Sequence, residues 1–400
     1  MWTIKYTLLN VSYFAAFCTV HAYAAVYLLE KGFTNTEVGI LLAVANILSA
    51  VLQPVVAGII DRKGRLTNRG FIFISVGIIL AGSVALMIAP DEKILIFIVY
   101  ALIYLIQFTY QPVMTALCFE YKKAGCDIFY GLARGLGSAS FAVTSMFVGG
   151  LVEKGGVTVL LWINIATMIL SAVVLLLFGK PRTALDGAAS GESEERSISQ
   201  TGSKTGIRSF VREYPAFMLF LVGTICFFFA HNMINDFMIQ IIRSLGGKET
   251  ELGIANFLQA ILELPVMALI GVVLKKISAN RLLVFSGFAF LVKILILVFA
   301  GSMAQMYLSQ SFQLFAYAVF IPAGAYYVSN TMKEADQVKG QAFITSAITI
   351  GGVFSNFISG MILDRSNITT MLIVGSAVCA VGVVLTFFAM TRRLKKDTEL

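Results

Sequence analysis

Long apolar stretches, most of them about 20 residues in length, alternate along the chain with short segments that carry charge, glycine or proline. About 20 apolar residues in a helix span the ~30 Å hydrocarbon core of a bilayer. The pattern therefore predicts an all-α membrane protein with twelve transmembrane helices, at residues 6–29, 37–60, 69–89, 94–118, 129–152, 157–178, 216–242, 251–274, 282–300, 305–329, 341–363 and 368–390.

One long polar segment, residues 180–213, divides the predicted spans into six and six. Its runs of small and polar residues contain too little apolar surface to bury a core. We therefore predict four parts, namely an N-terminal six-helix bundle at 1–179, a cytoplasmic polar linker at 180–213, a C-terminal six-helix bundle at 214–391 and a cytoplasmic tail at 392–400.

The two halves resemble each other in sequence. Pro112 pairs with Pro322 and Gly150 with Gly360, both at an offset of 210 residues, and segment 36–40 has a counterpart at 250–254. Matches that recur at a nearly constant offset indicate an internal repeat. Two parallel repeats of six helices predict pseudo-symmetric bundles with a cavity between them near the membrane midplane, an architecture that alternates access to its two sides.

Composition and charge agree with a membrane protein. Of the 400 residues 58% are apolar and only 13% are charged, which excludes an ordinary soluble domain. If the N-terminus is inside, 22 of the 30 Lys and Arg residues fall in inner loops and tails and six fall in outer loops. The positive-inside rule then predicts a multi-pass plasma-membrane protein, as in a bacterial inner membrane, with both termini cytoplasmic. The net charge of +8 is thus topological and indicates no nucleic-acid partner.

Ionisable residues within the predicted spans are few, and such residues usually face a wet cavity because charge at bilayer depth is costly. Glu263 and Lys293 lie near the midpoints of consecutive spans and can reach each other as an ion pair, either functional or purely structural. His231 can pair with Asn235 one helical turn on. Away from the ends of the spans, the set is His21, Arg134, His231, Asp236, Glu263 and Lys293.

These residues suggest roles in proton coupling and in binding. Glu263, Asp236, His231 and Lys293 are candidates for proton coupling, since hydration shifts their protonation; a buried histidine with satisfied hydrogen bonds is the plainer interpretation of His231. Arg134 offers a rigid fork of donors to hydroxyls or a carboxylate, or it extends to the membrane interface.

The junction of the second and third spans resembles the inner-loop signature of the major facilitator superfamily. It reads Gly58-Ile-Ile-Asp61-Arg62-Lys63-Gly64-Arg65. In that family the loop's carboxylate and cations can lock a tight turn in one access state, which implies a gating role for Gly58, Asp61, Arg62, Gly64 and Arg65.

Segments 39–54 and 130–137 are similar to the lactose permease and oligosaccharide:proton symporter branch of that superfamily. The resemblance places the branch's substrate-binding arginine at Arg134, its substrate-binding glutamate at Glu263 and its sugar-stacking aromatic at Phe141. Asn232, Asn235 and Gln313 occupy the positions of other polar residues of that branch. Its proton relay is altered here, because its ninth-span arginine becomes Lys293 and its tenth-span ionisable residues become Gln310, Gln313 and Ala316.

The resemblance implies a secondary transporter that moves a small polar solute, such as a sugar, oligosaccharide or glycoside, by proton symport. A nucleoside symporter, an efflux antiporter of amphiphilic compounds and a non-transporting sensor are the alternatives. The sequence contains no GxxxxGK[ST] loop, no HExxH motif and no Cys/His cluster with metal-ligand spacing. We therefore expect no enzymatic activity, no cofactor and no metal, and a monomer whose partners are the solute, protons and the lipid bilayer.

Overall fold

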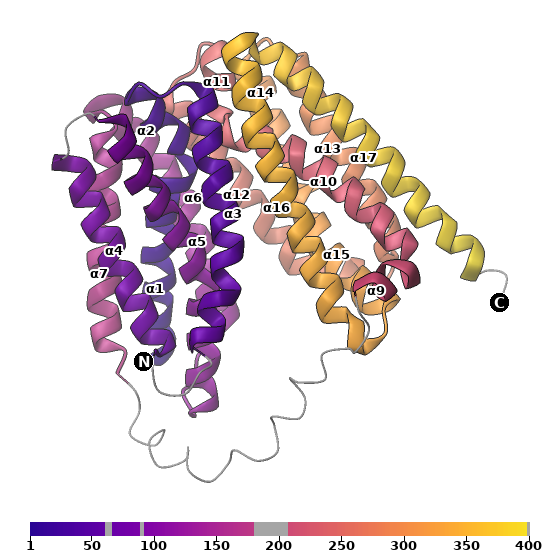
Figure 1. Cartoon of the computed structure of the whole chain (residues 1–400), viewed down its shortest axis with the longest axis horizontal. Helices are drawn as coiled ribbons and strands as arrows, with labels where there is room; N and C mark the ends of the chain where they lie inside the picture. The colour runs from indigo at the N-terminus through magenta and orange to yellow at the C-terminus, as the bar shows by residue number, and fades with distance from the viewer. Residues whose placement is uncertain (61–65, 89–91, 180–206, 398–400) are drawn as a thin grey trace. The chain divides into compact units, whose positions relative to one another are not determined.

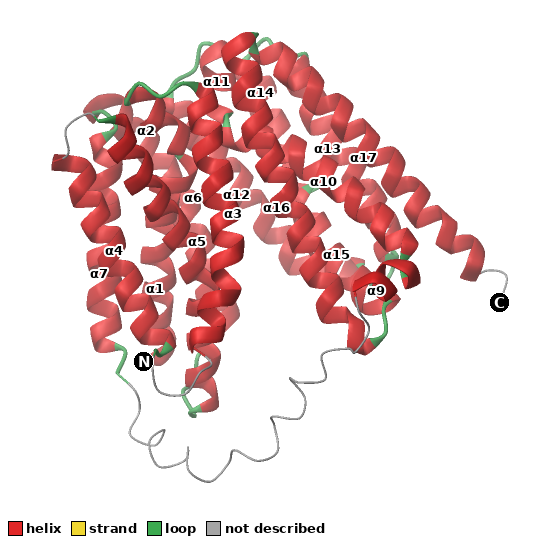
Figure 2. Cartoon of the chain, viewed as in Figure 1, coloured by secondary structure: helices red, strands yellow, loops and turns green. Residues whose placement is uncertain are grey.

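The computed structural model describes residues 1–60, 66–88, 92–179 and 207–397, and all its regular elements in that range are helices (Figure 1, Figure 2). The first half contains α1 (Trp2–Phe17), η1 (Cys18–Ala22), α2 (Ala24–Glu30), α3 (Asn35–Ile60), α4 (Asn68–Ile88), α5 (Lys93–Lys123), α6 (Tyr130–Gly155) and α7 (Thr158–Leu177). The second contains α9 (Ile207–Glu213), α10 (Pro215–Asp236), α11 (Met238–Ser244), α12 (Glu249–Val273), α13 (Ala279–Val298), α14 (Met303–Ser311), η3 (Phe312–Leu314), α15 (Tyr317–Thr331), α16 (Glu334–Arg365) and α17 (Ile368–Asp397).

These helices are consistent with the twelve predicted spans. Within the described residues, 10 helices are long and apolar enough to cross a membrane, and the bent pair Trp2–Ala22 and Ala24–Glu30 brings the number to 11. The eighth predicted span corresponds to α12, which at 25 residues is long enough to cross but carries three glutamates. The all-α membrane class is confirmed.

The chain forms two compact units. The N-terminal unit comprises Met1–Ser190 and Gly246–Ala260, and the C-terminal unit comprises Gly191–Leu245 and Ile261–Leu400. In the N-terminal unit α1 packs on α6 and α7, while α4 packs on α5 and α7. In the C-terminal unit α10 packs on α16 and α17, and α13 packs on α15 and α17. The boundary between the units falls within α12.

The C-terminal end of the predicted linker is helical. Residues 180–206 lie outside the described part of the chain, whereas Ile207–Glu213 form α9. Phe210 of this helix is fully buried and stacks on Phe343 of α16 with ring centroids 5.2 Å apart. The apolar Phe210 therefore fastens α9 to the C-terminal unit.

Three predicted spans are interrupted where the sequence analysis expected continuous helices. In span 6–29 the π-helical turn Cys18–Ala22 and a break at Tyr23 bend the helix by 49°. Span 216–242 is broken at Phe237, whose backbone (φ −114°, ψ 25°) resembles that of Tyr23 (φ −110°, ψ 14°). Span 305–329 contains the 3₁₀ turn η3 between α14 and α15. Such interruptions free backbone groups and are common where helices line functional sites.

Glycine sets the spacing of several helix pairs. A Cβ at Gly137 of α6 would lie 2.6 Å from Phe14 Cδ2 of α1, and one at Gly351 of α16 would lie 2.6 Å from the carbonyl oxygen of Ile225 in α10. Both positions therefore need glycine for close helix approach, as in other membrane proteins. Gly131 and Gly135, by contrast, face open space.

Candidate functional site

Three polar side chains of the C-terminal unit form a continuous chain of hydrogen bonds. Lys293 Nζ of α13 donates to Gln313 Oε1 at 2.7 Å, and Gln313 Nε2 donates to Glu263 Oε1 of α12 at 2.8 Å. Lys293 and Gln313 are each 1% exposed, and Glu263 is half-buried. The structure thus brings Glu263 and Lys293 together, joined through the amide of Gln313.

The interruption of the tenth span places Gln313 in this chain. Gln313 lies on the 3₁₀ turn η3, where the backbone N–H of Phe315 donates to the carbonyl oxygen of Phe312, and side chains of α13 and α14 support the turn. Ser286 Oγ donates to the carbonyl oxygen of Ala316 at 2.7 Å, and Ser309 Oγ donates to that of Lys293 at 2.8 Å. These bonds fix the turn against α13, so the amide of Gln313 is held between the two charged groups.

The bridging amide compensates both charges in a medium where an isolated charge is costly. The carbonyl oxygen of Gln313 accepts from the ammonium, and its N–H group donates to the carboxylate. Charge-assisted hydrogen bonds of this kind are stronger than neutral ones. Another donor can replace the N–H of Gln313 at the carboxylate of Glu263, or a proton can bind to that carboxylate. Either event also changes how well the positive charge of Lys293 is compensated.

His231 lies in an aromatic setting within the same unit. Its ring stacks on Tyr317 with centroids 5.3 Å apart and meets Phe228 and Phe290 edge to face. The hydrogen bond expected from the i, i+4 spacing is present, with Asn235 Nδ2 2.9 Å from His231 Nε2. The amide N–H of Asn235 can only donate, so Nε2 of His231 accepts and carries no proton. The ring proton is therefore assigned to Nδ1. Within the described residues, Nδ1 has no hydrogen-bond partner.

Two other candidates of the seventh span lie at its far end. Asn232 Nδ2 packs on the backbone of α16, where a Cβ at Gly352 would lie 2.6 Å from it. Asp236 is the last residue of α10, next to the break at Phe237. The break separates Asn232 and Asp236 on α10 from Gln240 on α11, so these three polar residues do not share one continuous helix.

The remaining binding candidates belong to the N-terminal unit. Arg134 of α6 donates from Nη1 to Ser138 Oγ at 2.7 Å, and its guanidinium carbon lies 4.3 Å from the ring centroid of Phe14. This cation–π contact orients the guanidinium while leaving several of its donors available. Phe141, two turns further along α6, is half-buried and lies 6.4 Å from Phe17 between ring centroids.

His21, one of the ionisable residues singled out in the spans, occupies an aromatic cluster that the sequence did not predict. The π-helical turn directs its ring between Phe17 and Tyr104, each with a centroid separation of 3.8 Å, and against the edge of Phe108 at 4.5 Å. In the described part of the chain neither ring nitrogen has a hydrogen-bond partner. His21 and His231 are separated by 210 residues, the offset of the repeat, and this is the signal that relates them.

Helix α6 crosses the beginning of α12 within the N-terminal unit. Ser145 Oγ donates to the carbonyl oxygen of Gly253 at 3.2 Å, and Tyr23 Oη donates to the carbonyl oxygen of Ser145 at 3.0 Å. At the end of the crossing Thr250 Oγ1 donates to Glu153 Oε2 at 2.6 Å, and Lys248 Nζ lies 3.3 Å from Glu153 Oε1. The hydrogen bond from Thr250, followed by that from Lys248, lowers the pKa of Glu153.

The predicted gating loop is described only in part. Gly58 is exposed at the end of α3, and a Cβ there would meet nothing within 4 Å. Asp61, Arg62, Gly64 and Arg65 lie outside the described residues. Across the described ranges there is no group of three or more His, Cys, Asp or Glu residues that could hold a metal ion.

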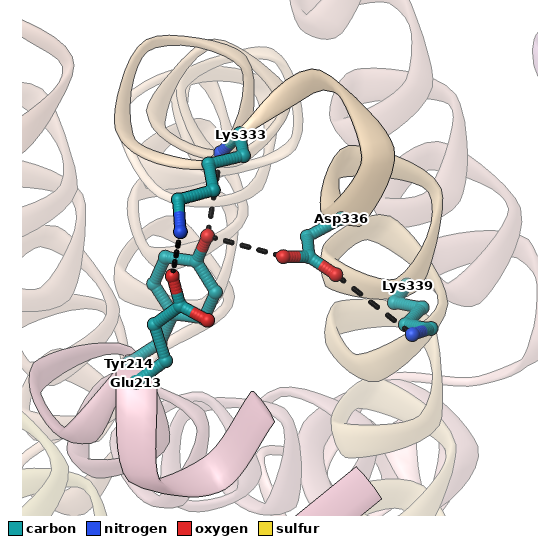
Figure 3. A network of polar contacts seen from close by, with 5 residues as sticks. All are labelled: Glu213, Tyr214, Lys333, Asp336 and Lys339. Carbon is teal, nitrogen blue, oxygen red and sulfur yellow. Dashed lines mark hydrogen bonds and ion pairs between the residues drawn. The ribbon is translucent and has the colours of Figure 1, made fainter. Parts of the chain in front are cut away.

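A second polar network joins the end of α9 and Tyr214, which precedes α10, to Lys333 and the first turns of α16 (Figure 3). Tyr214 Oη donates to Asp336 Oδ2 at 3.3 Å and accepts from the backbone N–H of Lys333 at 3.3 Å. Lys333 Nζ also donates to Glu213 Oε1, which raises the pKa of Lys333, and Lys339 Nζ lies 3.8 Å from Asp336 Oδ1. Asp336 is 3% exposed, whereas the Lys333 side chain is 74% exposed.

We expect the buried part of this network to contribute more to stability than its exposed ion pair. Tyr214→Phe removes the phenol donor from the buried Asp336 and should lower the free energy of unfolding by ~1–3 kcal/mol. Lys333→Met should change it by less than ~1 kcal/mol, because exposed ion pairs contribute little. Thermal unfolding of the purified variants in one detergent checks both values. An equal loss in the two variants would contradict the assignment.

Comparisons with known proteins agree with the fold. A family model described as "MFS_1 like family" matches residues 1–391. The uncharacterized transporter YwbF of Bacillus subtilis (strain 168) is 21% identical over 374 residues, covering 92% of this chain and 88% of that protein. The solved nucleoside transporter NupG superposes with a TM-score of 0.79 at 15% identity, covering 97% of this chain and 98% of that one. An inward-facing, unoccupied bacterial homolog of the human lysosomal transporter Spinster superposes with a TM-score of 0.72 at 12% identity, covering 98% and 97%.

Proposed function

The chain belongs to the MFS_1 like family and is a membrane transporter of that type, and from this premise we propose that it is a secondary active transporter of a small polar solute. The proposed solute is a sugar, oligosaccharide or glycoside, and protons are the proposed co-substrate. The proposal includes a monomer in the plasma membrane with both termini in the cytoplasm, as the distribution of Lys and Arg predicts.

The chain of hydrogen bonds from Glu263 through Gln313 to Lys293 is the observation that supports the proposal most strongly. One neutral amide joins a carboxylate to an ammonium. A proton or a solute hydroxyl that reaches the carboxylate can break this set of hydrogen bonds and form a new one. A proton on Glu263 removes the negative charge that Lys293 requires, and a solute hydroxyl can replace the N–H of Gln313 at the carboxylate. Solute and proton binding at Glu263 are therefore coupled through a shared set of hydrogen bonds.

Polar atoms and aromatic faces nearby suit a polyhydroxylated ring. In the C-terminal unit, His231 Nδ1 has no partner among the described residues, and Tyr317 stacks on that ring. In the N-terminal unit, Arg134 retains donors beyond its bond to Ser138, and Phe141 presents an aromatic ring one turn further along α6 from Ser138. Directional donors and acceptors beside aromatic faces are typical of sites that bind ring solutes.

A nucleoside is the second candidate solute. The fold superposes on the nucleoside transporter NupG over nearly the whole of both chains, and the aromatic residues around His21 and His231 can stack on a base as well as on a sugar. Both candidates share a ribose-like or pyranose-like polyol, so the hydrogen-bonding role proposed for Glu263 is the same in each case.

Uptake into proteoliposomes tests the proposal. With an inward proton gradient, the purified protein should accumulate a radiolabelled sugar or nucleoside above its external concentration, and a protonophore should abolish the accumulation. A panel of monosaccharides, disaccharides, glycosides and nucleosides distinguishes the two solute classes. If no member of the panel accumulates, and only amphiphilic dyes are moved in exchange for protons, the proposal is wrong. The protein would then be an efflux antiporter.

A further inference from the structure

A groove on the C-terminal unit has features of a lipid site that are separate from the polar chain. It has a volume of about 530 Å³ and lies between α12, α13 and the η3–α15 segment. Its walls are apolar, and the most exposed of the large apolar residues that line it are Leu269 (60%) and Phe285 (49%). The one charged side chain that lines it is Arg281, in the first turn of α13. A groove of this size accommodates a flexible apolar chain.

The loose packing of α12 explains why the groove exists. In the C-terminal unit α13 packs closely on α15 and α17, whereas α12, as far as its residues are described, makes only sparse contacts with its neighbours. Pro265, which lines the groove, removes a backbone N–H from the helix and disfavours a straight continuation. The gap between helices is therefore open on its apolar side, where a membrane protein meets lipid tails.

The length of the groove matches one leaflet. Its α12 wall runs from Pro265 to Val273, about 12 Å at 1.5 Å per residue. Half of a hydrocarbon core of ~30 Å is about 15 Å. The groove thus begins at the membrane interface near Arg281 and ends near the midplane at Leu314 and Phe315, the two residues that follow Gln313.

Cations gather at the interfacial end and have no local counter-ion. Lys275, Lys276 and Arg281 are all exposed, and none of them makes an ion pair within the described ranges. The sequence from Pro265 to Ala300 contains no Asp or Glu. Clusters of Lys and Arg next to a transmembrane helix attract the headgroups of anionic lipids.

We propose that this groove binds one acyl chain of an anionic phospholipid, with its phosphate held by Arg281 and the neighbouring lysines. The chain lies along α12 and ends against the turn that carries Gln313. Binding of the lipid therefore stabilises the turn in the position that the hydrogen bonds to Glu263 and Lys293 require. The inference rests on membrane insertion and on the groove, and it is independent of which solute is carried.

Tryptophan quenching by brominated lipids in liposomes tests the proposal without any transport assay. Trp2 and Trp162, the two native tryptophans, are replaced by Phe, and one new tryptophan is introduced by Phe285→Trp in the groove. The control is Phe354→Trp on α16, which is similarly exposed (55%) and has no charged residue within two turns of its helix. Each variant is titrated with brominated phosphatidylglycerol and, separately, with brominated phosphatidylcholine.

At the groove we expect phosphatidylglycerol to bind about fivefold or more tightly than phosphatidylcholine. One cation near an anionic headgroup contributes about 1 kcal/mol, which corresponds to about fivefold in affinity. At position 354 the two lipids should quench equally, and Arg281→Gln should reduce the preference at the groove toward that of the control, with Lys275 and Lys276 accounting for the remainder. Equal quenching by the two lipids at the groove, or an unchanged preference in Arg281→Gln, would overturn the proposal. Leu269→Trp serves as a second probe of the same groove if Phe285→Trp does not fold.

Discussion

Replacing Glu263 by Gln is expected to abolish accumulation of the solute under an inward proton gradient. The substitution preserves the shape of the side chain and an oxygen that accepts from Gln313, but it removes the negative charge that compensates Lys293 and the site that binds the proton. The charge-assisted hydrogen bond proposed between a solute hydroxyl and the carboxylate contributes about 1.5–3 kcal/mol, so its replacement by a weaker neutral bond should lower affinity by up to roughly 150-fold. Initial uptake and steady-state accumulation in proteoliposomes measure the effect.

The same α12 supplies a matched control for this prediction. Glu251 Oε2 accepts from the backbone N–H of Lys248 at 2.7 Å, a capping bond that glutamine can also accept. Glu251→Gln should therefore leave accumulation close to that of the unmodified protein. Because exchange of labelled for unlabelled solute requires no net proton movement, Glu263→Gln should retain more exchange than accumulation. Unchanged accumulation in Glu263→Gln would remove this residue from the mechanism.

Replacing Gly149 by Ala is expected to inhibit transport by preventing the close approach of α6 and α12. A Cβ at Gly149 would overlap the carbonyl oxygen of Glu249, which belongs to a helix backbone and cannot rotate away. Overpacking of this kind costs about 1–3 kcal/mol, so we expect about a 5- to 150-fold loss of the closely packed conformation. The rate of solute uptake should fall accordingly, because the overpacked crossing distorts the N-terminal unit on which the proposed transport depends.

The adjacent glycine provides the control for the crossing. A Cβ at Gly150 would meet only Thr250 Oγ1 at 3.7 Å, an ordinary contact, so Gly150→Ala should transport normally. Cysteines in place of Glu153 and Thr250, in a protein without its five native cysteines, report the crossing through a short thiol cross-linker. Gly149→Ala should reduce the cross-linking yield and Gly150→Ala should not. Equal yields in the two variants would show that the crossing tolerates a methyl group.

The sequence predicted the features that depend on hydrophobic pattern and helical spacing. Apolar stretches of membrane length gave the all-α class, and the i, i+4 spacing of His231 and Asn235 gave their hydrogen bond. The proximity of Glu263 and Lys293 followed from their depth in consecutive spans. Each of these inferences needs only the geometry of single helices or the thickness of a bilayer.

The features that the sequence did not predict arise where helices are interrupted or cross. Gln313 bridges Glu263 and Lys293 because η3 breaks the tenth span, and no glycine or proline next to the break marks it in the sequence. The placement of His21 depends on a π-helical turn, which leaves no clear pattern in the sequence. The requirement for glycine at Gly149 depends on the backbone of α12, about 100 residues away in the chain.

Proton movement driven by the solute is the most direct test of the central claim that Glu263, Gln313 and Lys293 couple the two. Proteoliposomes in weakly buffered medium receive a downhill gradient of the transported sugar or nucleoside while a pH electrode records the external medium. The account predicts that the medium becomes alkaline as protons enter with the solute, and that Glu263→Gln removes this response. Solute entry without any change of external pH, or an equal response in Glu263→Gln, would contradict it.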